Sequence, residues 1–381
     1  MRIRLQGPAK GAIPALSAVA LATGLALVPA AAASATNMSG AAALVDVTQT
    51  NLVSDHALTS DPNVVVDPTL VNPWGMSFGT GATPTPLWVS DNGQEASTLY
   101  RTSATPPAFA KVPLTVAVPG GPTGQVFNPS ASEFAVTVGQ ATGPAKFIFA
   151  TESGWIYGWN PNVPAANSTT ATPAGRAPNG VLKGLALASA NGSDFLYAAD
   201  FSNGAVDVFD TSFALQNWKG AFRDPMIPKS YAPFNVQLLN GKLYVTYAKK
   251  KAGTVDDEAG LGHGFVDVYT TTGRLDKRLV RHRALNSPWG LAIAPSSWGP
   301  LAGSLLVGNF GDGQIHAYNA KNGRSLGTIG DAAHNPITID GLWGLMPGNG
   351  VAGDPQSVIF TAGPGEETQG LLGILTAVPE A

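Results

Sequence analysis

The sequence predicts an all-β protein: a six-bladed β-propeller closed by an N-terminal strand in its last blade. A sequence pattern recurs about every 50 residues along the chain, and this spacing is close to the length of one propeller blade. Each copy consists of short strands of alternating apolar and polar residues, separated by glycine-rich turns. One further strand near the start of the chain has no blade of its own, and it could close the ring by completing the last sheet.

The repeated phrase starts with an apolar inner strand. A Trp-Gly pair after Pro or Leu marks this start in residues 72–75, 287–290 and 341–344. Two longer copies, residues 195–210 and 304–319, match almost letter by letter through an apolar strand, a polar residue, a Gly turn and an alternating strand. The spacing predicts six inner strands, which begin near Trp74, Glu133, Lys183, Phe234, Trp289 and Trp343.

The second and third strands of each blade follow these starts in order. Second strands are expected at residues 86–91, 146–151, 195–200, 242–247, 304–309 and 357–362. Third strands are clearest at residues 154–159, 205–209, 264–269 and 314–318. Asn-Gly and Asp-Gly pairs at residues 203–204, 240–241 and 312–313 have the composition of hairpin turns between them.

The last copy ends near Val378 without a clear outer strand. Residues 45–54 form an unassigned strand, and we expect them to complete the final blade by pairing the two ends of the chain. The alternative is a seven-bladed ring, if residues 101–132 contain an additional sheet.

The first 35 residues are typical of a signal peptide. Arg2, Arg4 and Lys10 precede an apolar stretch at residues 13–28, which is followed by Ala-x-Ala cleavage sites. The alternative is an uncleaved membrane anchor. The expected organisation is therefore a signal peptide at 1–35, a short linker at 36–44 and one propeller at 45–381, in a protein secreted by a bacterium.

Composition narrows the classes of function. A net charge of −3 gives no basic surface of the kind that nucleic acid requires. The chain has no cysteine, which excludes disulfides, thiolate catalysis and Cys-ligated metal. No second hydrophobic span follows the leader, so we expect a mature chain without a membrane span. It is expected to act as a monomer on an unknown extracellular ligand or protein.

The candidate ligand face is one mouth of the central channel. The start of each inner strand and the end of each second strand meet at this mouth, where carboxylate, amide and hydroxyl oxygens could bind a cation such as Ca²⁺. The alternative role of these residues is to cap strands and form turns. The positions are Asp91, Glu133, Thr151, Asp200, Asn235 and Asn309, of which Asp91, Asp200 and Asn309 are the metal-ligand candidates.

A long excursion at residues 249–262 interrupts the fourth blade on the same side. It carries three lysines and then three acidic residues, and loops of this length on a rigid scaffold often hold function. Asp256, Asp257 and His263 are its candidate ligand residues. The alternative is a self-neutralising surface loop. The chain contains no Gly-x-Ser-x-Gly, P-loop or His-Glu-x-x-His motif.

Four runs of sequence carry a resemblance to a known family: residues 72–75, 263–269, 306–313 and 339–345. Across residues 46–378 the chain resembles an uncharacterised family of secreted bacterial six-bladed β-propellers related to NHL-repeat proteins. This resemblance implies the fold and assigns no reaction. Gluconolactonase-like lactonases use a similar ring with a metal held by Glu, Asn and Asp, but only Glu133 and Asn235 occupy comparable positions here.

Two hypotheses for the function follow. The preferred one is a non-enzymatic extracellular binding or scaffold protein that uses the channel mouth. The alternative is a metal-assisted hydrolase or lactonase with oxygen ligands in the channel. Whether the protein is an enzyme is left open by the sequence.

Overall fold

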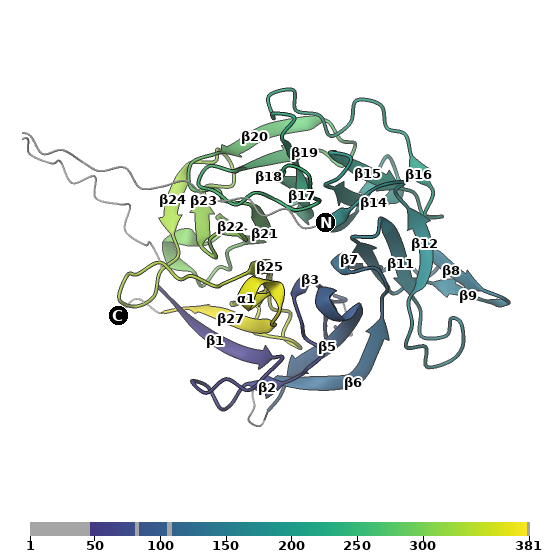
Figure 1. The fold of residues 1–381 in the computed structure, drawn as a ribbon, viewed down its shortest axis with the longest axis horizontal. Helices are drawn as coiled ribbons and strands as arrows, with labels where there is room; N and C mark the ends of the chain where they lie inside the picture. The colour runs from purple at the N-terminus through teal and green to yellow at the C-terminus, as the bar shows by residue number, and fades with distance from the viewer. Residues whose placement is uncertain (1–45, 81–83, 105–108, 379–381) are drawn as a thin grey trace, which may run out of the picture. The chain divides into compact units, whose positions relative to one another are not determined.

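The computed structural model describes residues 46–80, 84–104 and 109–378. The predicted signal peptide and linker lie outside these residues. Residues 46–378 form a six-bladed β-propeller, in which six sheets surround a central channel (Figure 1). No helix among the described residues has the length and apolar character needed to cross a membrane.

Each blade is a meander of four antiparallel strands, numbered here from the channel outwards. Blade 1 contains β3 (Pro73–Ser77), β4 (Leu87–Asp91), β5 (Ala96–Thr102) and β6 (Phe109–Ala117). Blade 2 contains β7 (Pro122–Phe127), β10 (Phe147–Thr151), β11 (Trp155–Trp159) and β12 (Thr172–Arg176). Blade 3 contains β13 (Leu182–Ala190), β14 (Ser193–Asp200), β15 (Ala205–Phe209) and β16 (Leu215–Gln216).

The second half of the ring repeats the pattern. Blade 4 contains β17 (Tyr231–Leu239), β18 (Lys242–Lys249), β19 (Gly264–Tyr269) and β20 (Leu275–Arg281). Blade 5 contains β21 (Pro288–Ile293), β22 (Leu305–Asn309), β23 (Ile315–Tyr318) and β24 (Ser325–Thr328). Blade 6 contains β25 (Leu342–Pro347), β26 (Val358–Ala362), β27 (Leu371–Ala377) and β1 (Val47–Ser54).

Strand β1 closes the ring, as the sequence predicted. It pairs antiparallel with β27 from Val47 opposite Ala377 to Ser54 opposite Leu371, so the first and last described strands share one sheet. Its Val47 and Val53 are buried between the sheets. A two-residue strand, β2 (Val65–Val66), pairs with its outer edge. The C-terminal strand β27 therefore has a partner on both sides.

One predicted inner strand was wrong. The inner strand of blade 2 is β7, because Pro122, Thr123 and Gly124 occupy the positions that Pro, Trp and Gly hold in blades 1 and 5. Glu133 instead lies just before a small hairpin, β8 (Ala135–Val138) and β9 (Ala141–Pro144), inserted between β7 and β10. The described residues within 101–132 end β5, form β6 and supply β7, and they add no seventh blade.

The glycine of the repeated phrase is required because neighbouring inner strands nearly touch. A Cβ on Gly75 would lie 2.5 Å from the carbonyl oxygen of Thr123, and one on Gly124 would lie 2.3 Å from the amide nitrogen of Leu185. Blade 4 has Asn235 at this position, where its amide nitrogen donates a hydrogen bond to the carbonyl oxygen of Trp289 (2.8 Å). These contacts fix the radius of the channel.

The tryptophan that precedes the repeated glycine on three of the inner strands closes the channel. Trp74 and Trp343 stack with ring centroids 3.5 Å apart, and Phe310 stacks on the other face of Trp343 at 4.0 Å. Trp289 meets both tryptophans edge-on. All three tryptophans are at most 4% exposed. We call this cluster the aromatic plug; its members are Trp74, Phe201, Phe234, Trp289, Phe310 and Trp343.

Candidate functional site

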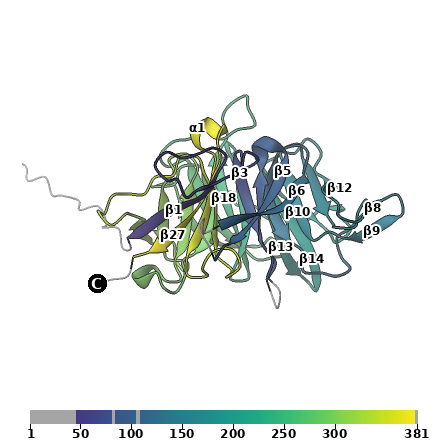
Figure 2. The ribbon, with the colours of Figure 1, turned by 90° about the horizontal axis from the view of Figure 1, so that it is seen from below.

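Polar and charged side chains from different blades gather where the inner strands begin, directly beside the aromatic plug. The same face carries the turns that join second and third strands, including α1 (Pro364–Glu367), which projects from the ring in side view (Figure 2). We call this set the mouth cluster. It contains Asn72, Asn92, Glu152, Lys183, Asp257 and Glu367.

Lys183 lies at the centre of the cluster. It occupies on β13 the position that tryptophan holds in three other blades, and it is 3% exposed. Its ammonium donates a hydrogen bond to a carboxylate oxygen of Glu152 (2.5 Å). The same nitrogen lies 5.0 Å from the centroid of the Trp74 ring, within the range of a cation–π contact. A buried ammonium needs such partners to offset the loss of its hydration, and Glu152 and Trp74 supply them here.

Two amides connect Glu152 with a second carboxyl. Asn92 donates to Glu152 (3.0 Å), and Asn72 donates to Asn92 (3.3 Å) and to Glu367 (2.7 Å). The indole nitrogen of Trp343 donates to the side-chain oxygen of Asn72 (2.9 Å), which fixes the orientation of that amide. The chain of contacts thus links blades 2, 1 and 6 across one side of the mouth and fastens it to the plug.

Two carboxyls of the cluster have raised pKa values. Burial raises the pKa of Glu367; Glu152 and Asp257 raise it further, while its bond from Asn72 and nearby Lys183 oppose the shift. Burial also raises the pKa of Asp257, against the opposing influence of Ser287 and Lys183. Neither Glu367 nor Asp257 forms an ion pair within the described residues. The mouth therefore holds more carboxyl groups than cations to neutralise them.

The excursion between β18 and β19 brings Asp257 to this position. Lys249 pairs with Glu258 (2.6 Å), and Lys250 donates to the carbonyl oxygen of Ser202 in blade 3 (2.9 Å). At the exit, the backbone nitrogen of Gly260 donates to the side chain of Asn286 (2.6 Å). The loop is thus tied to blades 3 and 5 by direct bonds, with Asp257 close enough to Lys183 for their charges to interact.

The other predicted loop residues lie outside the cluster. Asp256 is exposed. The ring of His263 bonds through Nδ1 to the carbonyl oxygen of Glu258 (2.9 Å) and packs against Gly260, so it supports the loop. Glu133 lies just before the hairpin β8–β9 that is inserted in blade 2. Asn235 lies one residue beyond the plug and bonds to a neighbouring strand.

The four aligned positions at the ends of second strands have their side chains within the blades. Thr151 bonds to the backbone of Trp155, and Asp200 accepts from the backbone nitrogens of Val181 and Asn203. Asn309 donates to the carbonyl oxygen of Ala284 (2.7 Å). Asp91 is fully buried beside Thr98, and burial raises its pKa well above the usual range.

The contacts of Thr151, Asp200 and Asn309 match the alternative role as turn and strand caps, whereas the carboxyl of Asp91 has no hydrogen-bond partner in the described structure. No group of three or more His, Cys, Asp or Glu side chains in the described part of the chain is arranged to hold a metal ion. Asp200 and Asn309 are engaged in these local bonds, and calcium binding by Asp91, Asp200 and Asn309 stays a prediction.

The sequence reasoning missed Asn72, Asn92, Glu152, Lys183 and Glu367. A usable signal existed for two of them. Lys183 stands where the repeat has tryptophan, and Asn72 directly precedes the repeated Pro-Trp-Gly. Glu152 and Glu367 lie in short turns that carry no recognisable pattern.

The chain is similar to two uncharacterised proteins of Acanthamoeba polyphaga mimivirus. It is 32% identical to R648 over 315 residues, which cover 81% of this chain and 75% of R648. It is 31% identical to L690 over 335 residues, which cover 84% of each. No family model matches the chain. The relatives found are viral, so the bacterial source and the link to NHL-repeat proteins remain expectations.

Solved structures with the same fold have low sequence identity. A Bacteroides thetaiotaomicron protein of unknown function aligns over 87% of this chain and 76% of its own, with a TM-score of 0.51 and 12% identity. An α-L-arabinanase of Penicillium chrysogenum complexed with arabinobiose aligns over 86% and 98%, with a TM-score of 0.50 and 14% identity. At such identities the similarity shows the propeller fold alone.

Proposed function

The chain belongs to the family of the mimivirus proteins R648 and L690, and from this premise we propose that it is an exported binding protein whose ligand site is the mouth cluster. The ligand class that this site favours is a small organic cation, such as a primary amine or a guanidinium compound. One observation carries the proposal: carboxyls from blades 2, 4 and 6 face a single buried lysine at one mouth of the channel.

Charge balance is the physical reason. Lys183 neutralises Glu152, with which it forms an ion pair, whereas Glu367 and Asp257 are left without a cationic partner in the described structure. Their raised pKa values express the free-energy cost of ionising them there. A ligand ammonium placed between them would stabilise both ionised forms, and charge-assisted hydrogen bonds are the strongest available to such a ligand.

The test is a titration of the purified protein with small ammonium and guanidinium compounds, each paired with a neutral compound of the same shape, followed by calorimetry. Glu367→Gln and Asp257→Asn should each weaken binding about 10- to 100-fold, because a hydrogen bond to a charged group contributes about 1.5–3 kcal/mol. Their sequence neighbours Glu366→Gln and Asp256→Asn are matched controls and should bind as the wild type does. Equal binding by all four variants would refute the site.

Proton linkage gives a second readout of the same site. Because the cation favours ionised Glu367 and Asp257, binding should release protons and should tighten as pH rises through the raised pKa values of these groups. Calorimetry in buffers of different ionisation enthalpy measures this release. Binding without proton release in the wild type would show that neither carboxyl meets the ligand.

A second candidate function is supported by the different environments of two carboxyls. Glu152 is paired with a lysine, whereas the pKa of Glu367 is raised, and a carboxylate beside a carboxylic acid is the arrangement used in acid–base hydrolysis. This candidate is an alternative to the metal-assisted hydrolase, whose candidate ligands Asp200 and Asn309 are engaged in local hydrogen bonds. Turnover of chromogenic esters or glycosides that disappears in Glu367→Gln, with ligand binding retained, would favour it.

Export is part of the proposal. The charged start and the Ala-x-Ala sites favour a mature N-terminus near Ser34 or Thr36. N-terminal sequencing of secreted protein tests this; an intact Met1 on membrane-bound material would contradict it.

A further inference from the structure

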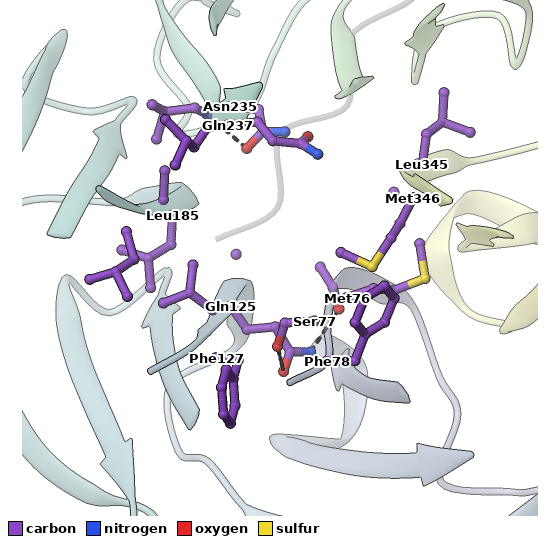
Figure 3. Close-up of a pocket in the computed structure, with 18 of the residues that line it drawn as sticks. Met76, Ser77, Phe78, Gln125, Phe127, Leu185, Asn235, Gln237, Leu345 and Met346 are labelled. Atoms are coloured by element: carbon purple, nitrogen blue, oxygen red, sulfur yellow. Dashed lines mark hydrogen bonds between the residues drawn. The ribbon is translucent and has the colours of Figure 1, made fainter. Parts of the chain in front are cut away.

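The opposite half of the channel contains a cavity of about 590 Å³. One end of the cavity lies at the plug residue Trp289. From there the cavity continues away from the plug, lined by β3, β7, β13, β17 and β25. Figure 3 shows Leu185 on one wall and Leu345 and Met346 on the opposite wall. Its volume lies within the usual range of 300–1,000 Å³ for small-molecule sites.

The lining is largely apolar and carries no charge. Met76, Phe78, Phe127, Leu187 and Met346 supply large apolar side chains, and none of the described residues around the cavity has an ionisable side chain. This is the reverse of the mouth cluster on the other side of the plug. An ionic ligand would lose its hydration here without gaining an ion pair, so the lining selects against charge.

A small number of polar groups face the same space. Ser77 and the backbone of Gly75 already satisfy the amide of Gln125, at 3.1 and 2.8 Å. The amide of Gln237 points into the cavity (Figure 3), and in the described structure it makes no hydrogen bond. It therefore offers an NH2 donor group and a carbonyl acceptor to a ligand. An apolar wall with one free amide is suited to a neutral molecule with a single polar group.

The cavity follows from the geometry of the ring. Backbone contacts at Gly75 and Gly124 prevent the inner strands from moving closer, so side chains alone must fill the channel. The aromatic plug fills it at one level only. Beyond the plug the space stays open and reaches the surface at Thr80, Pro129 and Leu238, which are exposed.

We infer that this half of the channel is a second ligand site, which takes a small, neutral, largely apolar molecule with one hydrogen-bonding group. The plug separates it from the mouth cluster, so the inference does not depend on the proposed function. A ligand enters from the face of the turns between first and second strands and lies with its polar group at Gln237.

Two fluorescent probes with similar aromatic bodies test the inference. N-phenyl-1-naphthylamine is neutral, and 1-anilinonaphthalene-8-sulfonate carries a sulfonate on the same framework. The full-length mature protein should bind the neutral probe in a 1:1 complex and the sulfonate at least tenfold more weakly. Met346→Trp places a bulky ring in the cavity and should reduce binding of the neutral probe at least tenfold. Met226→Trp, at a position that is 62% exposed and outside the cavity, is the matched control and should bind like the wild type.

Circular dichroism and thermal unfolding of each variant confirm that it is folded. If Met346→Trp does not fold, Leu187→Trp fills the same space from the opposite wall, where Leu187 is only half-buried. Gln237→Leu should keep the 1:1 stoichiometry and weaken the neutral probe severalfold. Absence of binding to the wild type, equal affinity for both probes, or full binding by a folded cavity-filling variant would each overturn the inference.

Discussion

Replacing Trp343 by alanine tests whether the aromatic plug holds the ring together. Trp343 is 1% exposed, stacks between Trp74 and Phe310, and donates its indole hydrogen bond to Asn72. The substitution opens a cavity where six inner strands converge. Truncation of a buried tryptophan costs about 3–5 kcal/mol in unfolding free energy.

Two local terms place the expected loss at the upper end of that range. Each lost ring contact contributes about 0.5–1.5 kcal/mol, and the side-chain oxygen of Asn72 would lose its donor, at about 1–3 kcal/mol if it stays unpaired. These terms overlap with the truncation cost, so we expect a total of about 5 kcal/mol. That is a large part of the 5–15 kcal/mol typical of a native domain.

Equilibrium unfolding in guanidinium chloride, followed by circular dichroism and by fluorescence, measures this loss. Coincident transitions are needed before a single free energy is extracted. Trp155→Ala is the control, because Trp155 lies half-buried on β11 beside Arg176 and outside the plug, and its loss should be clearly smaller. A loss below about 1.5 kcal/mol for Trp343→Ala would refute the view that the plug is a packed core, because buried large-to-small changes cost more than that.

Three further predictions concern the ring. A chain of residues 56–381 should be less stable than one of residues 46–381 by roughly 5 kcal/mol, because burial of Val47, Leu52 and Val53 contributes about 1.5–3 kcal/mol each; equal melting temperatures would exclude closure by β1. Gly124→Ala should destabilise the ring by more than about 1 kcal/mol in urea unfolding, because its Cβ would meet the backbone of β13 at 2.3 Å; an unchanged midpoint would show that the strands can separate. Burial next to Asp224 raises the pKa of Asp267 to about 7, so the folded protein holds a proton there that the unfolded chain releases near pH 4. Stability should therefore fall as pH rises from about 4 to 7, and Asp267→Asn should flatten this part of the profile; an unchanged slope would rule out Asp267 as its source.

The sequence predicted the repeat and its closure because these depend on local patterns. Trp74, Trp289 and Trp343 each precede a glycine that lies too close to the neighbouring strand to carry a side chain. The same Trp-Gly pair therefore recurs in these blades. Blade 2 was misread at Glu133 because Thr123 replaces tryptophan and a hairpin separates its first two strands. The repeat is weaker there, although Pro122 and Gly124 match the Pro and the Gly of the other blades.

The candidate site could not be predicted in the same way. Asp91, Asp200 and Asn309 occupy the same position in different blades, and residues repeated in this way stabilise the structure of each blade. The mouth cluster consists instead of residues that break the repeat, such as Lys183 in a tryptophan position and Asp257 in a loop that other blades lack. Their partners come from distant parts of the chain, and only the closed ring brings them together.

The pairing of β1 with β27 also sets an order of events during synthesis. The first strand of the propeller emerges from the ribosome long before its partner, which ends at Ala377. At about 5–20 residues per second, β1 has no sheet to join for roughly 15–65 s. Blades 1 to 5 can form in that interval, but blade 6 cannot. A chain exported while it is being made would therefore cross the membrane without a closed ring; the last residue of the plug, Trp343, is made before β27, and the ring closes only after β27 has been released.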